Sequence, residues 1–165
     1  MDAATAPNSL NLDRYLAAAG SPAASFARLW QSLWVQPYVS PPLLELCRLT
    51  LAHLHQDELE LILENPHLEP GALTLERREL LLAGRAFKSA AFTPVEKALL
   101  QFTESYALDP QSIADEAAEE VKVHLGEPGL VFLIEALGCI DGRIRTARCL
   151  RDLRRFSPGE AVHVR

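Results

Sequence analysis

The 165-residue chain has no pair of cysteines separated by two residues, and it has only three cysteines in all: Cys47, Cys139 and Cys149. An odd number without such a pair excludes a small disulfide-stapled scaffold. We expect Cys139 and Cys149 to share one helix, about 15 Å apart along its axis, which is too far for a disulfide bond. All three cysteines are therefore expected to be small, buried, hydrophobic side chains.

The chain also lacks an excess of positive charge, since 16 Lys and Arg stand against 22 Asp and Glu and give a net charge of −6. This balance argues against nucleic acid and anionic membrane surfaces as partners. The sequence shows no apolar run of membrane-spanning length and no basic start followed by an apolar core. We therefore expect no membrane span, no secretory signal and a cytoplasmic location.

Sustained alternation of apolar and polar residues, the mark of strands, is absent as well, and Leu, Ala, Glu and Arg favour helices. The all-α fold should have about six to seven helices, because proline, glycine and capping residues divide the chain. The expected helices cover approximately residues 12–19, 21–34, 42–63, 75–84, 94–108, 114–125 and 127–156. The expected domains are an N-terminal extension with a short helix (1–20), a helical domain (21–156) and a flexible C-terminal tail (157–165).

The segment from residue 42 to 64 is unusual, because its leucines spread around almost the whole helical circumference. A helix that is apolar all round is typical of a buried central helix. Its polar residues His53, Asp57, Glu60 and Glu64 are spaced by four, three and four positions. On one continuous helix they would form a single stripe, within about 60° of one another.

Three acidic side chains on successive turns repel each other, so an arginine, a metal, a shared proton or water should relieve the repulsion. The stripe is a solvated face, a polar pocket for acid/base or metal chemistry, or a protein contact. His53, Asp57 and Glu60 could supply two or three metal ligands. The pattern is weak evidence for a metal site, because His55, which would be a second histidine ligand, points to the other side of the helix.

The stretch from Leu43 to Glu60 resembles the core helix of the alkylhydroperoxidase D-like/carboxymuconolactone decarboxylase family. In that family a glutamate precedes an apolar run, an Asn-Gly-Cys-x-x-Cys motif and a later histidine. Glu45 matches the glutamate, and Asp57 and Glu60 fall on the two cysteines. Glu64 falls where the later histidine usually stands.

Later segments are similar to the same family. They are the Thr-Pro-x-Glu-x-Ala-Leu start at residues 93–99, Leu108-Asp109-Pro110, Asp115-Glu116, and Ile140-Asp141-Gly142 with Arg145. The order and spacing of these motifs over residues 20 to 150 carry the resemblance. It implies an orthogonal helical array and a homo-oligomer, a dimer, trimer or hexamer. Trp30, Trp34 and Tyr38 could form the subunit contact or belong to the core.

The resemblance also bears on chemistry, because peroxidase-type members use one cysteine thiolate to attack peroxide and the other to resolve the sulfenic acid. Asp57 and Glu60 cannot do this, so we predict that thiol peroxidase activity is absent. Of the family's proton relay only Glu45 remains.

Three hypotheses follow for function, none requiring a cofactor. The first is a family member of unknown substrate that binds a small molecule or has a structural role. The second is an acid/base or metal-assisted enzyme whose catalytic residues would be Glu45, His53, Asp57, Glu60 and Glu64. The third is weak peroxiredoxin-type antioxidant activity through Cys47. Arg143, Arg145 and Arg148 would either neutralise the stripe or lie on the surface.

Overall fold

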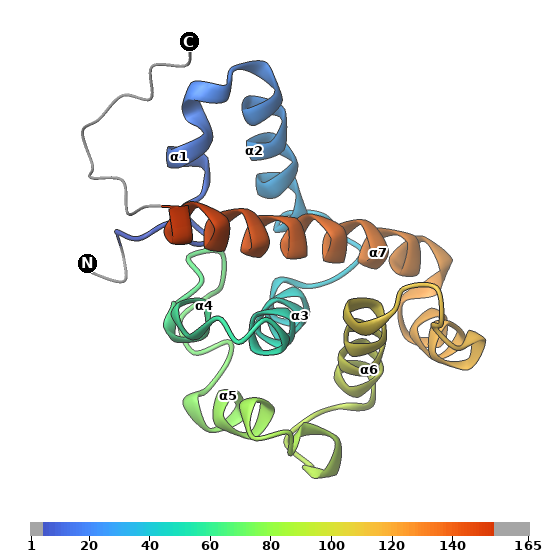
Figure 1. The fold of residues 1–165 in the computed structure, drawn as a ribbon. Coiled ribbons are helices and arrows are strands. Elements are labelled where there is room, and N and C mark those ends of the chain that lie inside the picture. The colour runs from blue at the N-terminus through green and yellow to red at the C-terminus, as the bar shows by residue number, and fades with distance from the viewer. Residues whose placement is uncertain (1–4, 154–165) are drawn as a thin grey trace.

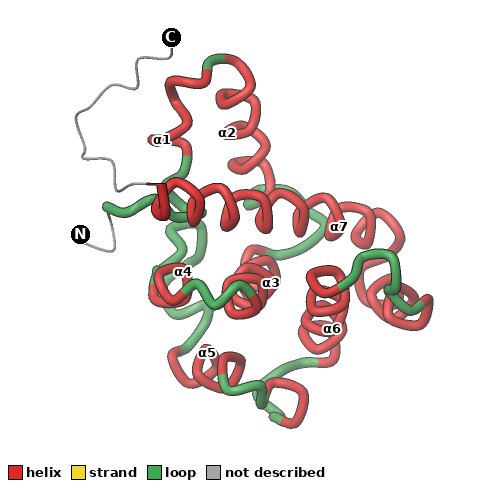
Figure 2. Tube along the Cα trace, viewed as in Figure 1, coloured by secondary structure: helices red, strands yellow, loops and turns green. Residues whose placement is uncertain are grey.

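The computed structural model describes residues 5–153, which form helices and loops with no strand among them (Figure 1, Figure 2). The elements are α1 (Asp13–Leu16), the 3-10 helix η1 (Ala17–Ala19), α2 (Ser21–Leu33), α3 (Pro41–Leu54), α4 (Glu58–Ile62), α5 (Leu75–Leu82), the 3-10 helix η2 (Ala86–Lys88), α6 (Pro94–Leu108) and α7 (Asp115–Leu153). The predicted all-α fold with about seven helices is confirmed. The expected tail at 157–165 and the expected helix end at 156 lie outside the described residues.

Local capping explains where several helices begin. The Thr74 side chain accepts a hydrogen bond from the backbone N–H of Arg77 at the start of α5. At the start of α6, where the sequence predicts a helix from residue 94, Thr93 and Glu96 form a capping box. Gly126, with a φ of 71°, produces a kink between the two helical stretches that were predicted on either side of it, which together form α7.

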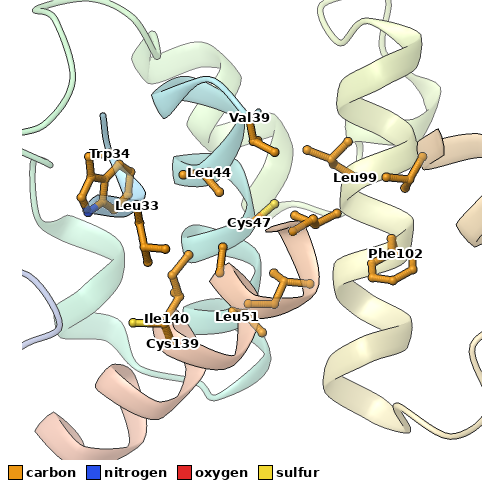
Figure 3. Packing of buried hydrophobic residues seen from close by; sticks show 14 of the residues in the cluster. Leu33, Trp34, Val39, Leu44, Cys47, Leu51, Leu99, Phe102, Cys139 and Ile140 are labelled. Atoms are coloured by element: carbon orange, nitrogen blue, oxygen red, sulfur yellow. The ribbon is translucent and has the colours of Figure 1, made fainter. Parts of the chain in front are cut away.

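The central helix is α3, whose residues from Leu44 to Ala52 are all buried. It packs against α6 and α7, and in Figure 1 α7 passes between the α1–α2 pair and the remaining helices. Cys47 lies among leucine and phenylalanine side chains of α3 and α6, as Figure 3 shows. Each large apolar side chain buried here stabilises the fold by about 1.5–3 kcal/mol. The expectation of a buried central helix is confirmed.

The single helix predicted over residues 42–63 is wrong, because the chain turns after Leu54. Gln56 has a left-handed backbone with a φ of 54°. The Asp57 N–H donates to the Ala52 carbonyl at 3.0 Å, and the Gln56 N–H donates to the His53 carbonyl at 2.9 Å. This pair of bonds is the Schellman motif that ends a helix. The sequence concealed it, because glutamine occupies the position where glycine usually signals such an end.

Part of the segment expected as an N-terminal extension packs into the same core. Ser9 and Leu12 are fully buried, and so is Trp30 of α2. Trp34 is buried as well, whereas Tyr38 is 49% exposed. Both tryptophans therefore belong to the core of the single chain. The homo-oligomer stays a prediction.

Helix α7 is long and apolar enough to cross a membrane by length and composition alone. One stretch of it has a mean hydropathy of 1.5, and 39% of that stretch is buried. The expectation that no apolar run reaches spanning length therefore does not hold for α7. One such helix is weak evidence for a membrane span, since the core helix of a water-soluble fold passes the same test. Helix α7 packs on α3 and α6.

Candidate functional site

A buried ionic cluster lies between α3 and α4, and its centre is the guanidinium of Arg48. Arg48 donates to Glu45 of its own helix through Nη2 at 2.7 Å and Nε at 2.8 Å. Its Nη1 donates to Glu60 Oε2 at 2.8 Å and to the Glu60 carbonyl at 3.2 Å. All three side chains are at most 1% exposed. Burial acts to lower the pKa of the Arg48 guanidinium, but Glu45 and then Glu60 outweigh it and raise that pKa.

Neutral groups complete the hydrogen bonds of the two carboxylates. Ser9 donates to Glu60 from its backbone N–H at 2.5 Å and from its hydroxyl at 2.7 Å. Asn65 Nδ2 donates to Glu45 Oε2 at 2.6 Å. Arg48 and these donors therefore relieve the repulsion between the two buried carboxylates.

Asp57 has a separate partner. Its side chain pairs with Arg151 of α7 and accepts the Glu60 backbone N–H at 3.4 Å as the N-cap of α4. Arg151 also donates to the Pro7 carbonyl at 2.6 Å. Asp57 thus connects the start of α4 to α7 and the N-terminal segment.

The other two residues of the predicted stripe lie elsewhere. His53 and Glu64 are exposed, whereas Asp57 and Glu60 are buried. His53 lies close enough to Glu104 of α6 to oppose the rise that burial causes in the pKa of that carboxyl. The predicted single stripe is therefore wrong, because the turn after α3 separates its members.

Metal binding through His53, Asp57 and Glu60 gains no support from this arrangement. Within residues 5–153, no three His, Cys, Asp or Glu side chains are grouped so that they could hold a metal ion. Glu60 is instead held by Arg48, and Asp57 by Arg151.

The three arginines proposed as partners of the stripe contact other groups. Arg143 donates to the Ser9 carbonyl and to Asp13, both at 2.7 Å. Arg145 pairs with Asp141 at 2.6 Å, and Arg148 donates to the His55 carbonyl. Sequence reasoning missed the two arginines that do neutralise the acids. Arg48 was detectable, because it stands three residues after Glu45 on an otherwise apolar helix.

Two of the three thiols are poorly suited to peroxide chemistry. Burial raises the pKa of the Cys47 thiol to about 12, although a hydrogen bond with Thr103 acts in the opposite direction. Burial likewise raises the pKa of Cys139 to about 11. Cys149 is exposed. Since the thiolate is the nucleophile, Cys47 and Cys139 are almost wholly unreactive thiols at neutral pH.

A cleft of about 550 Å³ opens beside the ionic cluster, and we call it the Glu45 cleft. Its lining comes from α3, α5 and the loop between α4 and α5: Glu45, Glu64, Asn65, Pro66, Leu68, Glu69, Pro70, Gly71, Ala72, Leu73, Leu75 and Arg78. Of the three charged side chains in the ionic cluster, Glu45 belongs to this lining. The volume of the cleft falls within the range of small-molecule sites, and its wall is partly apolar and partly polar.

The loop that lines the cleft also carries His67, which stacks on Trp34 with ring centroids 5.0 Å apart and planes 2° apart. Trp34 in turn contacts Trp30 edge to face, with centroids 5.1 Å apart. Burial and then the positive charge of Arg143 lower the pKa of His67 from its ordinary 6.5, and Glu45 acts in the opposite direction. The neutral ring is therefore the form that the fold favours.

We expect the intrinsic fluorescence of the native protein to fall on acidification with a midpoint below pH 6.5, because an imidazolium against Trp34 quenches the indole. The contribution of the neutral His67 ring to folding stability is fully present above the ordinary pKa of histidine, and it is lost as the pH falls through the lowered pKa of His67. His67→Gln should remove this step, and His124→Gln, at an exposed histidine, should keep it. If the fall in fluorescence on acidification persists in His67→Gln, another titrating group causes it.

The chain matches no protein-family model, no curated protein and no solved structure. The family resemblance therefore rests on the sequence motifs alone. Function is inferred from the geometry of the ionic cluster around Arg48 and of the Glu45 cleft.

Proposed function

We propose that this protein binds a small organic molecule in the Glu45 cleft and is not a thiol peroxidase. The observation that carries the proposal is a 550 Å³ cleft whose lining includes a carboxylate that is itself only 1% exposed and is held in place by a buried arginine. A polar group fixed in this way can orient a ligand without paying for its own immobilisation. On this view the chain is a member of the alkylhydroperoxidase D-like/carboxymuconolactone decarboxylase family, with the orthogonal array and homo-oligomeric assembly that the resemblance implies.

The alternative is acid/base catalysis by Glu45, His53, Asp57, Glu60 and Glu64, and for Asp57 and Glu60 it is less well supported. Glu60 accepts hydrogen bonds from Arg48 and Ser9, and Asp57 pairs with Arg151. Neither acid is among the residues that line the Glu45 cleft. A general acid or base needs to reach the proton that it transfers, so these two carboxylates are better explained as structural.

Filling the cleft should abolish ligand binding. Ala72 is a small residue of the lining, and Ala72→Trp adds an indole there. Compounds from a fragment library that raise the Tm of the wild type should no longer raise the Tm of this variant. They should still stabilise Ala90→Trp, where the same side chain is added at an exposed alanine outside the cleft. Unchanged binding by Ala72→Trp would contradict the proposal.

A thiol assay tests the absence of peroxidase chemistry. In the native protein, a disulfide reagent should modify one cysteine rapidly, the exposed Cys149, because burial keeps the Cys47 and Cys139 thiols protonated. All three cysteines should react after unfolding. Peroxide consumption should be the same for the wild type and Cys47→Ser. A peroxide turnover that Cys47→Ser removes would restore the antioxidant hypothesis.

A further inference from the structure

We infer that the Glu45 cleft selects an organic cation with an ammonium or amidinium head and an apolar body, an inference that rests on the proposed function. Three acidic side chains line the cleft, those of Glu45, Glu64 and Glu69, and its one basic residue is Arg78. The formal charge of the lining is therefore negative. A concave surface of one sign concentrates ligands of the opposite sign.

The single lining cation is already engaged. Arg78 donates through Nη1 to the Leu61 carbonyl at 3.2 Å and through Nη2 to the Leu63 carbonyl at 3.1 Å. Its Nη2 also lies 3.8 Å from Glu45 Oε1. Two of its five N–H donors are engaged in this way, and an anionic ligand that reached the others would also meet the acidic side chains of the lining. Anions are therefore disfavoured.

Glu45 retains an acceptor for an incoming donor. Its Oε2 accepts from Arg48 Nε and from Asn65 Nδ2, at 2.8 and 2.6 Å. Its Oε1 accepts one hydrogen bond, from Arg48 Nη2 at 2.7 Å, and the 3.8 Å to Arg78 is too long for a second. Each carboxylate oxygen can accept two hydrogen bonds. The free position on Oε1 suits the N–H of a cationic head group that reaches the 1% of the Glu45 side chain exposed at the cleft wall, and such charge-assisted bonds are the strong ones.

The rest of the lining indicates an apolar body for the ligand. It is supplied by leucine and proline side chains: Pro66, Leu68, Pro70, Leu73 and Leu75. Glu64 and Glu69 are exposed, so they contribute to the charge of the cleft while remaining in contact with solvent. A molecule with one cationic end and a hydrocarbon body matches both parts of this wall.

Three probes of the same shape separate head-group charge from apolar contact: phenylbutylamine, phenylbutyrate and phenylbutanol. Titration calorimetry at neutral pH and low salt should give the amine a Kd about tenfold or more below that of the carboxylate, with the alcohol between them. Ala72→Trp should abolish binding of the amine. The protein is used as the full chain.

Substitution of the exposed acids tests the charge argument without disturbing the buried cluster. Glu64→Gln/Glu69→Gln should reduce the preference for the amine about fivefold, whereas Glu76→Gln/Glu79→Gln, exposed and outside the lining, should leave it nearly unchanged. Equal affinities for the three probes, with binding still lost in Ala72→Trp, would overturn the cation preference and leave the proposed function standing. No saturable binding of any probe would overturn both.

Discussion

Arg48→Met is expected to destabilise the folded protein by about 3–5 kcal/mol, the cost of removing one partner from a buried ion pair. Methionine retains most of the apolar stem, so packing changes little. Glu45 and Glu60, each at most 1% exposed, would then face each other without the guanidinium that lies between them. The Tm should fall by roughly 6–20 °C, since about 2–4 °C is lost per kcal/mol in a chain of this size. Urea unfolding followed by circular dichroism measures the change.

A charge-free version of the cluster provides the control. Glu45→Gln/Arg48→Met/Glu60→Gln removes all three charges together, so no ion remains buried without a partner. Replacing a complete buried ion pair by neutral groups is often close to neutral for stability, so this variant should recover most of the loss. The interpretation fails if Arg48→Met alone costs less than about 1 kcal/mol, the net value of an ordinary hydrogen bond.

Arg143→Met is expected to cost about 2–4 kcal/mol, because the guanidinium connects α7 to the N-terminal segment and to Trp30. Its Nε donates to the Ser9 carbonyl, and its Nη1 donates to Asp13. Its charge lies 4.3 Å from the ring centre of Trp30 and 5.4 Å from that of Phe26. Because both tryptophans of the chain lie in this region, loss of the arginine should also change the fluorescence emission.

Arg145→Met, two residues along the same helix, is the matched control. Arg145 is 62% exposed and pairs with Asp141 one turn away. Exposed pairs of this kind contribute about 0.3–0.5 kcal/mol, so its loss should be barely measurable. Equal destabilisation by Arg143→Met and Arg145→Met would contradict the expectation that the buried contacts of Arg143 stabilise the fold more than the exposed pair of Arg145.

Much of the fold was predictable, because helix punctuation depends on local chemistry. The capping box at Thr93 and Glu96 follows from hydrogen bonds within a few residues, the break at Gly126 follows from the positive φ that glycine adopts easily, and both are present. The burial of α3 also followed from its sequence, since a helix apolar on every side has no face to give to solvent. The turn at Gln56 did not follow, because the signal for a left-handed residue there is weak.

The candidate site was predictable only in part. Asp57 and Glu60 were recognised as unusual, Glu45 was singled out by the family resemblance, and all three are buried. The grouping with His53 and Glu64 assumed one uninterrupted helix, so it failed at the same turn. The cleft depends on the loop from Glu64 to Thr74, whose path no periodic pattern predicts.

By itself the sequence determined that this chain is helical, that the helix beginning near Pro42 is buried, and that two carboxylates, Asp57 and Glu60, stand three positions apart just beyond its apolar run. The tertiary structure alone decided what neutralises those carboxylates. Arg48 is local to Glu45, but Glu60, Ser9 and Arg151 reach their partners across the fold, from 12, 51 and 94 positions away. A local pattern records the spacing of charges along one helix, whereas the pairing of those charges depends on which segments meet. Here α3, α4, α7 and the N-terminal segment meet, so the predicted acidic stripe becomes two separate ion-paired contacts, and the one that includes Glu45 lies beside an open cleft.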